Sequence, residues 1–287
     1  MKLFILSLIS LFSVAAFAQP KVVKSAIIKA KTETTFPENF GPPGGGGPGG
    51  DGGGFTMPRD MESTTTMYYT PDFMKVETLS DFGNNIVITD RVNKKTTTLI
   101  EAMGRKTGFF STDADAEQQR ARMDSMRNLR RDSLAALGLT FRDNKPELIY
   151  SDETKKVSGI TCKKVTIKAT GQNGQVSENV VWYNPEFKID AKSQAPSANP
   201  GGFGGGRGGM MMMGGMQGLD LIEGFPMEYE IVRGNGFKIH MTVLKVTPDA
   251  EIDGKTFEIP KGFDIKPMSE MQNGGGMRMI FRNGGRP

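Results

Sequence analysis

Few residues in this sequence could act as a nucleophile and its base, because its 287 residues include one cysteine, Cys162, and one histidine, His240. A cysteine nucleophile needs a base within hydrogen-bond reach, and these two residues could meet only through the fold. Cys162 stands between Thr161 and Lys163 in a strand-like segment, where a lone cysteine behaves as a small buried apolar residue. Nucleotide-binding, hydrolase and metalloprotease motifs are absent from the sequence. We therefore predict no catalytic residue and a protein that is not an enzyme, with a Cys162–His240 enzyme as a third alternative.

Methionine clusters are the other candidates for chemistry. Thioether sulfur is a soft ligand that suits Cu(I), and the clusters comprise Met210 to Met213, Met216, Met268, Met271, Met277 and Met279. Cysteine and histidine are missing from these clusters, and an oxidisable apolar insertion explains them equally well. We predict no metal site and no cofactor, with copper binding as the alternative.

The charge balance excludes one class of partner. The chain has 36 basic and 32 acidic residues, and the net charge of +4 is spread along the sequence. Nucleic-acid-binding domains carry a concentrated basic patch. We therefore predict no nucleic-acid partner.

The N-terminus has the pattern of a secretory signal peptide. A basic start at Lys2 precedes an apolar run from Leu3 to Phe17, and Ala16-Phe17-Ala18 fits the small-residue cleavage rule. The run is too short to span a membrane. We predict a signal peptide at residues 1–18, removal before Gln19, and a periplasmic or secreted protein that is not membrane-spanning.

Glycine marks the domain organisation. Residues 41–54 and 201–218 contain 10 glycines each, and chain of this composition has too little apolar surface to offset its backbone entropy. We predict one β domain over residues 19–267 with mobile insertions at 41–54 and 201–218. A flexible tail rich in methionine and glycine is expected at residues 268–287.

Between the glycine tracts the dominant sequence period is two, which is typical of strands. β-branched runs such as Thr96 to Ile100 favour a pleated surface. Strands are predicted at Val176–Tyr183 and Pro226–Arg233, and Gly234-Asn235-Gly236 predicts a tight hairpin before Phe237. The spacing of these runs indicates about 10 to 12 strands in a meandering antiparallel sheet.

One segment has helical character. The stretch from Asp113 to Leu137 lacks glycine, proline and β-branched residues, and Thr112 with Asp115 forms a capping-box pattern. A narrow apolar stripe predicts a helix laid across one face of the sheet; it comprises Met123, Met126, Leu134 and Leu137. Because the helix is rich in arginine, the alternative is a basic surface that docks anionic lipid headgroups or an acidic partner.

Four segments of the second half carry a family resemblance: Lys156–Lys164, Val181–Pro185, Leu221–Tyr229 and Gly254–Pro260. Their order resembles an uncharacterised exported bacterial family, domain of unknown function 4412, over Tyr150 to Lys266. The chain also resembles GLPGLI-type secreted proteins, and its closing motif is similar to the end of lipoprotein carriers of the LolA/LolB type.

The resemblance implies a mainly β (α+β) fold of LolA type, in which a curved antiparallel sheet forms an open half-barrel with one main helix. In that fold the concave face is an apolar cavity that holds acyl chains. Eight residues are the candidates for its lining: Tyr69, Phe73, Ile88, Trp182, Tyr229, Ile231, Phe237 and Ile239.

The resulting hypothesis is an exported non-enzymatic binding protein for lipid or lipoprotein acyl chains. Its alternative is a structural or interaction protein of the cell envelope, with glycine-rich spacer loops and no ligand cavity. An apolar cavity favours the first and a core filled by the chain's own side chains favours the second.

Overall fold

A computed structural model describes residues 20–37, 59–136, 145–170, 176–189, 216, 218–233 and 236–273. The predicted signal peptide, the tract 41–54, most of the tract 201–218 and the tail from residue 274 lie outside these residues.

Strands dominate the described part of the chain, and 12 of them form one sheet. Its order is β14-β7-β6-β5-β4-β3-β2-β13-β12-β10-β9-β8. The strands are β2 (Ala26–Thr35), β3 (Asp60–Tyr69), β4 (Phe73–Ser80), β5 (Gly83–Asp90), β6 (Lys95–Ala102), β7 (Arg105–Thr112), β8 (Glu147–Val157), β9 (Ile160–Thr170), β10 (Val176–Asn184), β12 (Phe225–Val232), β13 (Lys238–Pro248) and β14 (Asp264–Pro267). Two short strands, β1 (Lys21–Val23) and β11 (Phe187–Ile189), pair separately in parallel.

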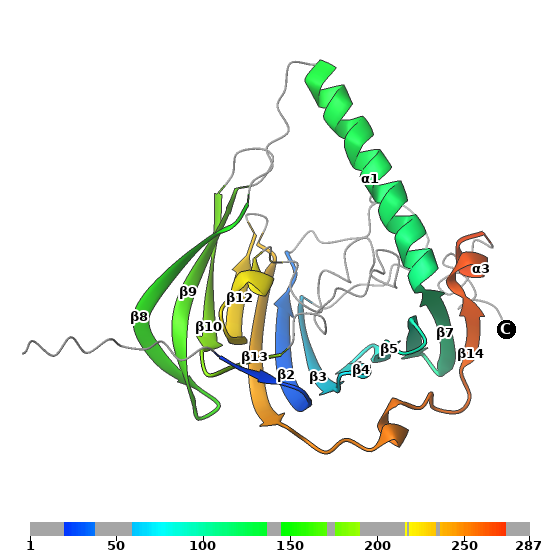
Figure 1. The fold of residues 1–287 in the computed structure, drawn as a ribbon, viewed down its shortest axis with the longest axis horizontal. Helices are drawn as coiled ribbons and strands as arrows, with labels where there is room; N and C mark the ends of the chain where they lie inside the picture. The colour runs from blue at the N-terminus through cyan, green and yellow to red at the C-terminus, as the bar shows by residue number, and fades with distance from the viewer. Residues whose placement is uncertain are drawn as a thin grey trace, which may run out of the picture.

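The sheet consists of two antiparallel meanders joined side by side. Strands β2 to β7 form the first, strands β8, β9, β10, β12 and β13 form the second, and β2 pairs with β13 at the junction. Only β14 runs parallel to its neighbour, β7. Figure 1 shows a strongly curved sheet that does not close into a barrel. The prediction of a mainly β chain built on a curved, open antiparallel sheet is confirmed.

The predicted hairpin is confirmed as the connection between β12 and β13, while Gly234 and Asn235 of its predicted turn lie outside the described residues. The amide of Arg233 donates to the carbonyl of Phe237 at 2.9 Å, and the amide of Gly236 donates to the carbonyl of Arg233 at 2.9 Å. Gly236 has φ 84°, a conformation that side chains with a Cβ rarely adopt.

Helix α1 (Asp113–Ala136) confirms the predicted helix and its start. The Thr112 hydroxyl donates to Asp115 Oδ2 at 2.8 Å, and the Thr112 amide donates to the same oxygen at 2.7 Å. The helix rises from the end of β7 above the mouth of the curved sheet (Figure 1). Within the described residues, no helix has the length and apolar character to cross a membrane.

Of the four stripe residues expected to face the sheet, Met126 alone has a described side chain and does not pack on it; the side chains of Met123, Leu134 and Leu137 lie outside the described part of the chain. The side chains of Met126 and Leu129 are both 64% exposed. The connection from β7 to β8 explains this, because these strands lie far apart in the sheet order, β8 at one edge and β7 next to the other. A helix between such strands must bridge the mouth instead of following one face.

Residues 249–263, here called the strap, connect β13 to β14 and run outside the curve (Figure 1). The strap contains the short 3₁₀ helix η3 (Gly254–Phe257), whose Phe257 ring stacks on Phe73 at 5.2 Å. Phe263 packs on the buried cluster of Ile86, Ile88 and Leu99. The strap therefore gives the convex face a small apolar core of its own.

The predicted flexible tail begins with a short helix, α3 (Met268–Asn273). The Met268 side chain is buried, so the first residue of that segment packs against the folded domain.

Candidate functional site

The strand register decides which side chains share the concave face. Cross-strand partners point to the same side of a sheet. One such row runs Tyr229–Met241–Thr32–Ser63, and the 3₁₀ helix η2 (Leu219–Leu221) lies on the same side of β12 (Figure 1). This side is the concave face, and the side that faces the strap is the convex face.

Four of the eight predicted lining residues come together on the concave face, in a filled core. Tyr229, Ile231, Phe237 and Ile239 belong to one buried cluster, and Ile222 beside η2 completes it. Phe237 also meets the ring of Phe36 edge-on. Burial raises the pKa of Tyr229 to about 12, because the phenolate would lose its hydration. The chain's own side chains thus occupy this half of the concave face.

Tyr69 lies on the same face but in a different buried cluster, with Met227 and Val243. The guanidinium of Arg91 lies 5.3 Å from the centre of its ring. Its position at the end of β3 separates it from the cluster around Tyr229.

The remaining three predicted residues lie on the convex face. Phe73 stacks on the strap, and Ile88 belongs to the cluster beneath it. Trp182 pairs with Glu228, and the Lys155 ammonium lies 5.5 Å from its ring centre. The register therefore divides the eight candidates between opposite faces, although the Trp182 side chain also packs against the buried cluster that contains Tyr69.

A row of half-buried apolar side chains crosses the other half of the concave face. Met67, Val76 and Val87 are cross-strand neighbours on β3, β4 and β5. The row continues at both ends into buried side chains, Ile28 on β2 and Thr98 on β6. Met67 packs against the buried cluster that contains Tyr69, whereas Val76 and Val87 belong to none of the three buried clusters that the described residues form. We call Met67, Val76 and Val87 the open row.

Polar side chains flank the open row. On one side Thr65, Thr78 and Asn85 form the next cross-strand row, and the hydroxyl oxygens of Thr65 and Thr78 are 3.1 Å apart. On the other side the next row is mixed, with Tyr69 and Met74 on β3 and β4 and with Thr89, paired with Thr96, on β5. The concave surface here therefore has a polar row on one side of the open row and a partly apolar row on the other.

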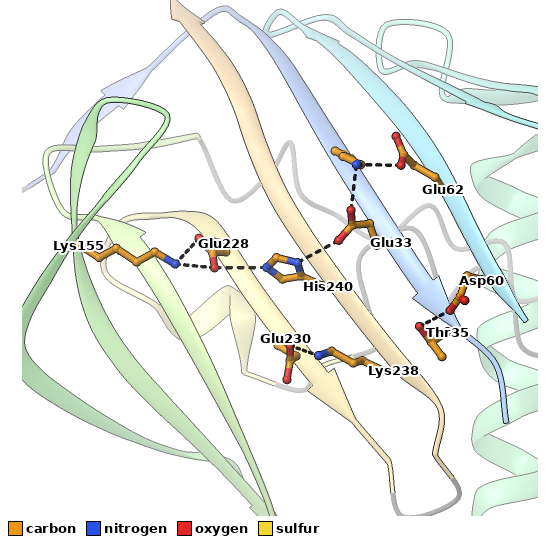
Figure 2. Close-up of polar contacts among 10 residues, drawn as sticks. Glu33, Thr35, Asp60, Glu62, Lys155, Glu228, Glu230, Lys238 and His240 are labelled. Carbon is orange, nitrogen blue, oxygen red and sulfur yellow. Dashed lines mark hydrogen bonds and ion pairs between the residues drawn. The ribbon is translucent and has the colours of Figure 1, made fainter.

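The convex face over the junction of the two meanders carries a continuous row of charges. Figure 2 shows Lys155, Glu228, His240 and Glu33 linked across four strands. Lys155 Nζ donates to both oxygens of Glu228 at 2.7 and 2.8 Å. His240 lies between the two carboxylates, with Nε2 3.3 Å from Glu228 Oε1 and Nδ1 3.4 Å from Glu33 Oε2.

Lysine 31 extends this charged row to β3. Lys31 Nζ lies 2.8 Å from Glu62 and 2.9 Å from Glu33, and the hydrogen bonds that it donates to these two carboxylates raise the pKa of Lys31. Hydrogen bonds from Lys31 and then His240 lower the pKa of Glu33. Burial alone would raise the pKa of Glu228, but hydrogen bonds from Lys155 and His240 outweigh it and the net shift is downward. Opposite charges compensate one another along the row, so it serves cohesion between strands.

The possible catalytic pair is not assembled. Cys162 on β9 and His240 on β13 are three strand positions apart, roughly 14 Å at ordinary strand spacing. Burial raises the pKa of the Cys162 thiol, which disfavours the nucleophilic thiolate. Cys162 is a buried free thiol, as predicted.

The methionine clusters fall mainly outside the described residues. Met216 packs against the core cluster around Tyr229, and Met268 is buried. Among the described histidine, cysteine and acidic residues, no group of three or more is placed to hold a metal ion.

No protein-family model and no curated protein matches the chain. Among solved structures it is similar to PNGF-II in two crystal forms, C2 and P2₁, with 13% and 14% sequence identity. The matches cover 87% and 89% of this chain but only 32% and 33% of PNGF-II. Their TM-scores of 0.33 and 0.34 are too low to bear on fold or function.

Proposed function

We propose that the protein is an exported, non-enzymatic binding protein that holds the acyl chain of a lipid or lipoprotein along the open row. The observation that carries this proposal is the half-buried state of Met67, Val76 and Val87 on the concave side of an open sheet. Solvent-accessible apolar side chains in a concave surface are the usual lining of a ligand site.

The direction of the open row suits an extended chain. The row crosses the strands at right angles, and three adjacent strands span roughly 10 Å between the outer two. An acyl chain along it would shield these side chains from water, and each buried methylene contributes about 0.8 kcal/mol. The polar row of Thr65, Thr78 and Asn85 beside it remains available to the polar end of the same ligand.

The proposed site differs from the predicted one. Tyr229, Ile231, Phe237 and Ile239 form core under η2, so the proposal assigns them to stability and moves ligand contact to β3, β4 and β5. The function expected from the sequence is retained, and its location changes.

The test compares two variants of one strand. Val76 and Leu79 both lie on β4, Val76 on the concave face and Leu79 on the convex face, where its side chain is 62% exposed. We expect Val76→Asp to weaken binding of a fluorescent fatty acyl probe at least about tenfold, because a carboxylate in the open row repels an apolar chain. Leu79→Asp should leave probe binding unchanged. Equal effects of the two variants, or no binding by the unsubstituted protein, would contradict the proposal.

The second candidate function is a structural or interaction protein of the cell envelope, without a ligand. The filled core around Tyr229 favours it, because half of the concave face is already occupied by the chain. Native mass spectrometry of protein purified from its own envelope separates the two functions. Co-purified lipid supports the binding protein, and a lipid-free mass together with no probe binding supports the structural one.

A further inference from the structure

Two buried polar atoms on the concave side of β5 have no hydrogen-bond partner, Asn85 Oδ1 and Thr89 Oγ1. Both residues share the face of Val87, and they are about 13 Å apart along the strand at the usual rise per residue. Buried polar groups in folded proteins are nearly always hydrogen-bonded, so an unbonded one that lies beside a proposed ligand surface is a candidate acceptor for that ligand.

The two atoms lie on opposite sides of the open row. Asn85 belongs to the polar row of Thr65 and Thr78, and Thr89 belongs to the row on the other side of Val87. A ligand in the open row would therefore pass between them. Its polar groups would come within reach of one atom or the other.

We propose that the ligand carries a hydrogen-bond donor, an amide N–H or a hydroxyl group near its acyl chain, which Asn85 Oδ1 accepts. This inference rests on the proposed binding of an acyl chain at the open row. A carbonyl oxygen can only accept a hydrogen bond, so Asn85 selects for a donor, whereas the Thr89 hydroxyl can donate or accept. The site then prefers an acyl amide or a hydroxylated acyl chain to a hydrocarbon or a simple ester.

The neighbouring residue provides a matched control. Asn84 Oδ1 is also buried without a partner, but Asn84 pairs with Leu79 and Glu101 on the convex face. Replacing Asn84 or Asn85 by leucine removes the same chemical group from the same strand. Only the second replacement touches the concave surface.

The experiment uses two competitors of equal chain length, palmitamide and methyl palmitate, against a fluorescent fatty acyl probe on the full mature chain. The amide has donors and the ester has none. We expect palmitamide to bind about tenfold more tightly than methyl palmitate. The ester would leave Asn85 Oδ1 buried and unbonded, and this disfavours the ester complex. Asn85→Leu should reduce this preference to about twofold or less without weakening the ester, and Asn84→Leu should preserve it.

Thermal unfolding of the ligand-free variants tests independently whether Asn85 Oδ1 is buried without a hydrogen bond. Asn85→Leu should unfold at the same temperature as the unsubstituted protein or higher, because it removes an unbonded buried acceptor. If that variant does not fold, Asn85→Ala removes the same acceptor with a smaller side chain, and it too should lower the preference for the amide.

The outcomes separate this inference from the proposed function. Equal affinity of the two competitors, or loss of the preference in both asparagine variants, overturns the donor inference while acyl binding stands. If neither competitor displaces the probe and no lipid binds, the proposed function itself fails.

Discussion

The concave face of the sheet has two halves that meet the rest of the chain differently. On β9, β10, β12 and β13 the side chains are large and apolar, and a segment around η2 covers them with Leu219 and Ile222. On β3, β4 and β5 the open row alternates with hydroxyl and amide side chains, and Val76 and Val87 join none of the buried clusters. One curved surface therefore contains a core region and a region whose apolar side chains are only half-buried.

This difference shows that curvature alone does not make a binding surface. The half on β9, β10, β12 and β13 has the large apolar side chains expected of a cavity, yet the chain itself fills it. A large apolar face gains the most free energy when an apolar segment of the same chain buries it. The half with mixed side chains gains less from being covered. A ligand site in such a fold is better sought where apolar side chains remain half-buried than where they are largest.

The largest expected effect tests the filled half. Ile239 is 2% exposed within the Tyr229 cluster, and Ile239→Ala should lower the free energy of unfolding by about 2 to 5 kcal/mol. Affinity of the folded variant for an acyl probe should not change. Urea unfolding and probe titration measure the two quantities.

The matched change in the other half is Val87→Ala. Val87 is half-buried, so we expect less than about 1.5 kcal/mol of destabilisation and a measurable loss of probe affinity. If the two variants exchange these effects, so that Ile239 controls binding and Val87 controls stability, the division of the concave face is wrong.

The second prediction uses the ionisation of Tyr229. Its pKa is raised from an ordinary value of 10.0 to about 12, so the neutral phenol stabilises the fold below pH 10 and this contribution is lost as the pH rises towards 12. We expect the folded protein to lose up to about 3 kcal/mol over that range. Tyr229→Phe should remove most of this loss, as measured by urea unfolding at several alkaline pH values. If the free energy of unfolding of the variant falls with alkaline pH as it does in the parent, then Tyr229 is hydrated. The half of the concave face around Tyr229 would then not be filled by the chain.

Much of the fold could be predicted because it follows from local patterns. The two-residue period placed β10 and β12 nearly to the residue, glycine positions marked the hairpin at Gly236, and Thr112 with Asp115 marked the start of α1. The packing of α1 could not be predicted in this way. It depends on the sheet order, which sets β7 and β8 far apart, and order is not encoded in any one segment.

The candidate site was harder to predict for a related reason. Alternation along β4 and β5 separates Phe73 and Ile88 from Val76 and Val87, but it does not say which face is concave. Both faces bury apolar side chains, because the strap covers the convex side with Phe257 and Phe263. Size and aromaticity therefore selected Phe73, Ile88 and Trp182, which lie on the convex face.

The third prediction concerns the junction between the two halves, where the charged row crosses from β12 to β2. The side chain of Glu228 is 15% exposed and bonds to Lys155 and His240, so Glu228→Gln should cost about 1 to 2 kcal/mol at neutral pH. Its lowered pKa means that the contribution is present above the ordinary value of 4.5 and disappears as the pH falls below it. The difference between variant and parent should therefore shrink in acid.

Glu230 supplies the control for that measurement. Glu230 lies on the same face of β12 and pairs with Lys238, but both side chains are over 40% exposed, at 44% and 46%. Exposed ion pairs contribute little, so Glu230→Gln should change stability by less than about 0.5 kcal/mol at any pH. Similar costs for the two variants would show that the charged row does not hold the halves together.

The smallest expected effect concerns the helix above the open half. Leu129 is 64% exposed, and a side chain so exposed contributes little to folding, so Leu129→Gln should change the free energy of unfolding by less than about 0.5 kcal/mol. Glutamine and leucine have similar helix propensities, which leaves packing as the one quantity that the substitution varies. Chemical unfolding of the ligand-free protein measures it. A cost of about 2 kcal/mol would mean that Leu129 is buried in the folded protein. The helix would then pack against the domain, and the open row would be its nearest unfilled apolar surface. In that case the two halves of the concave face would both be covered by the chain itself, and the contrast between them would disappear.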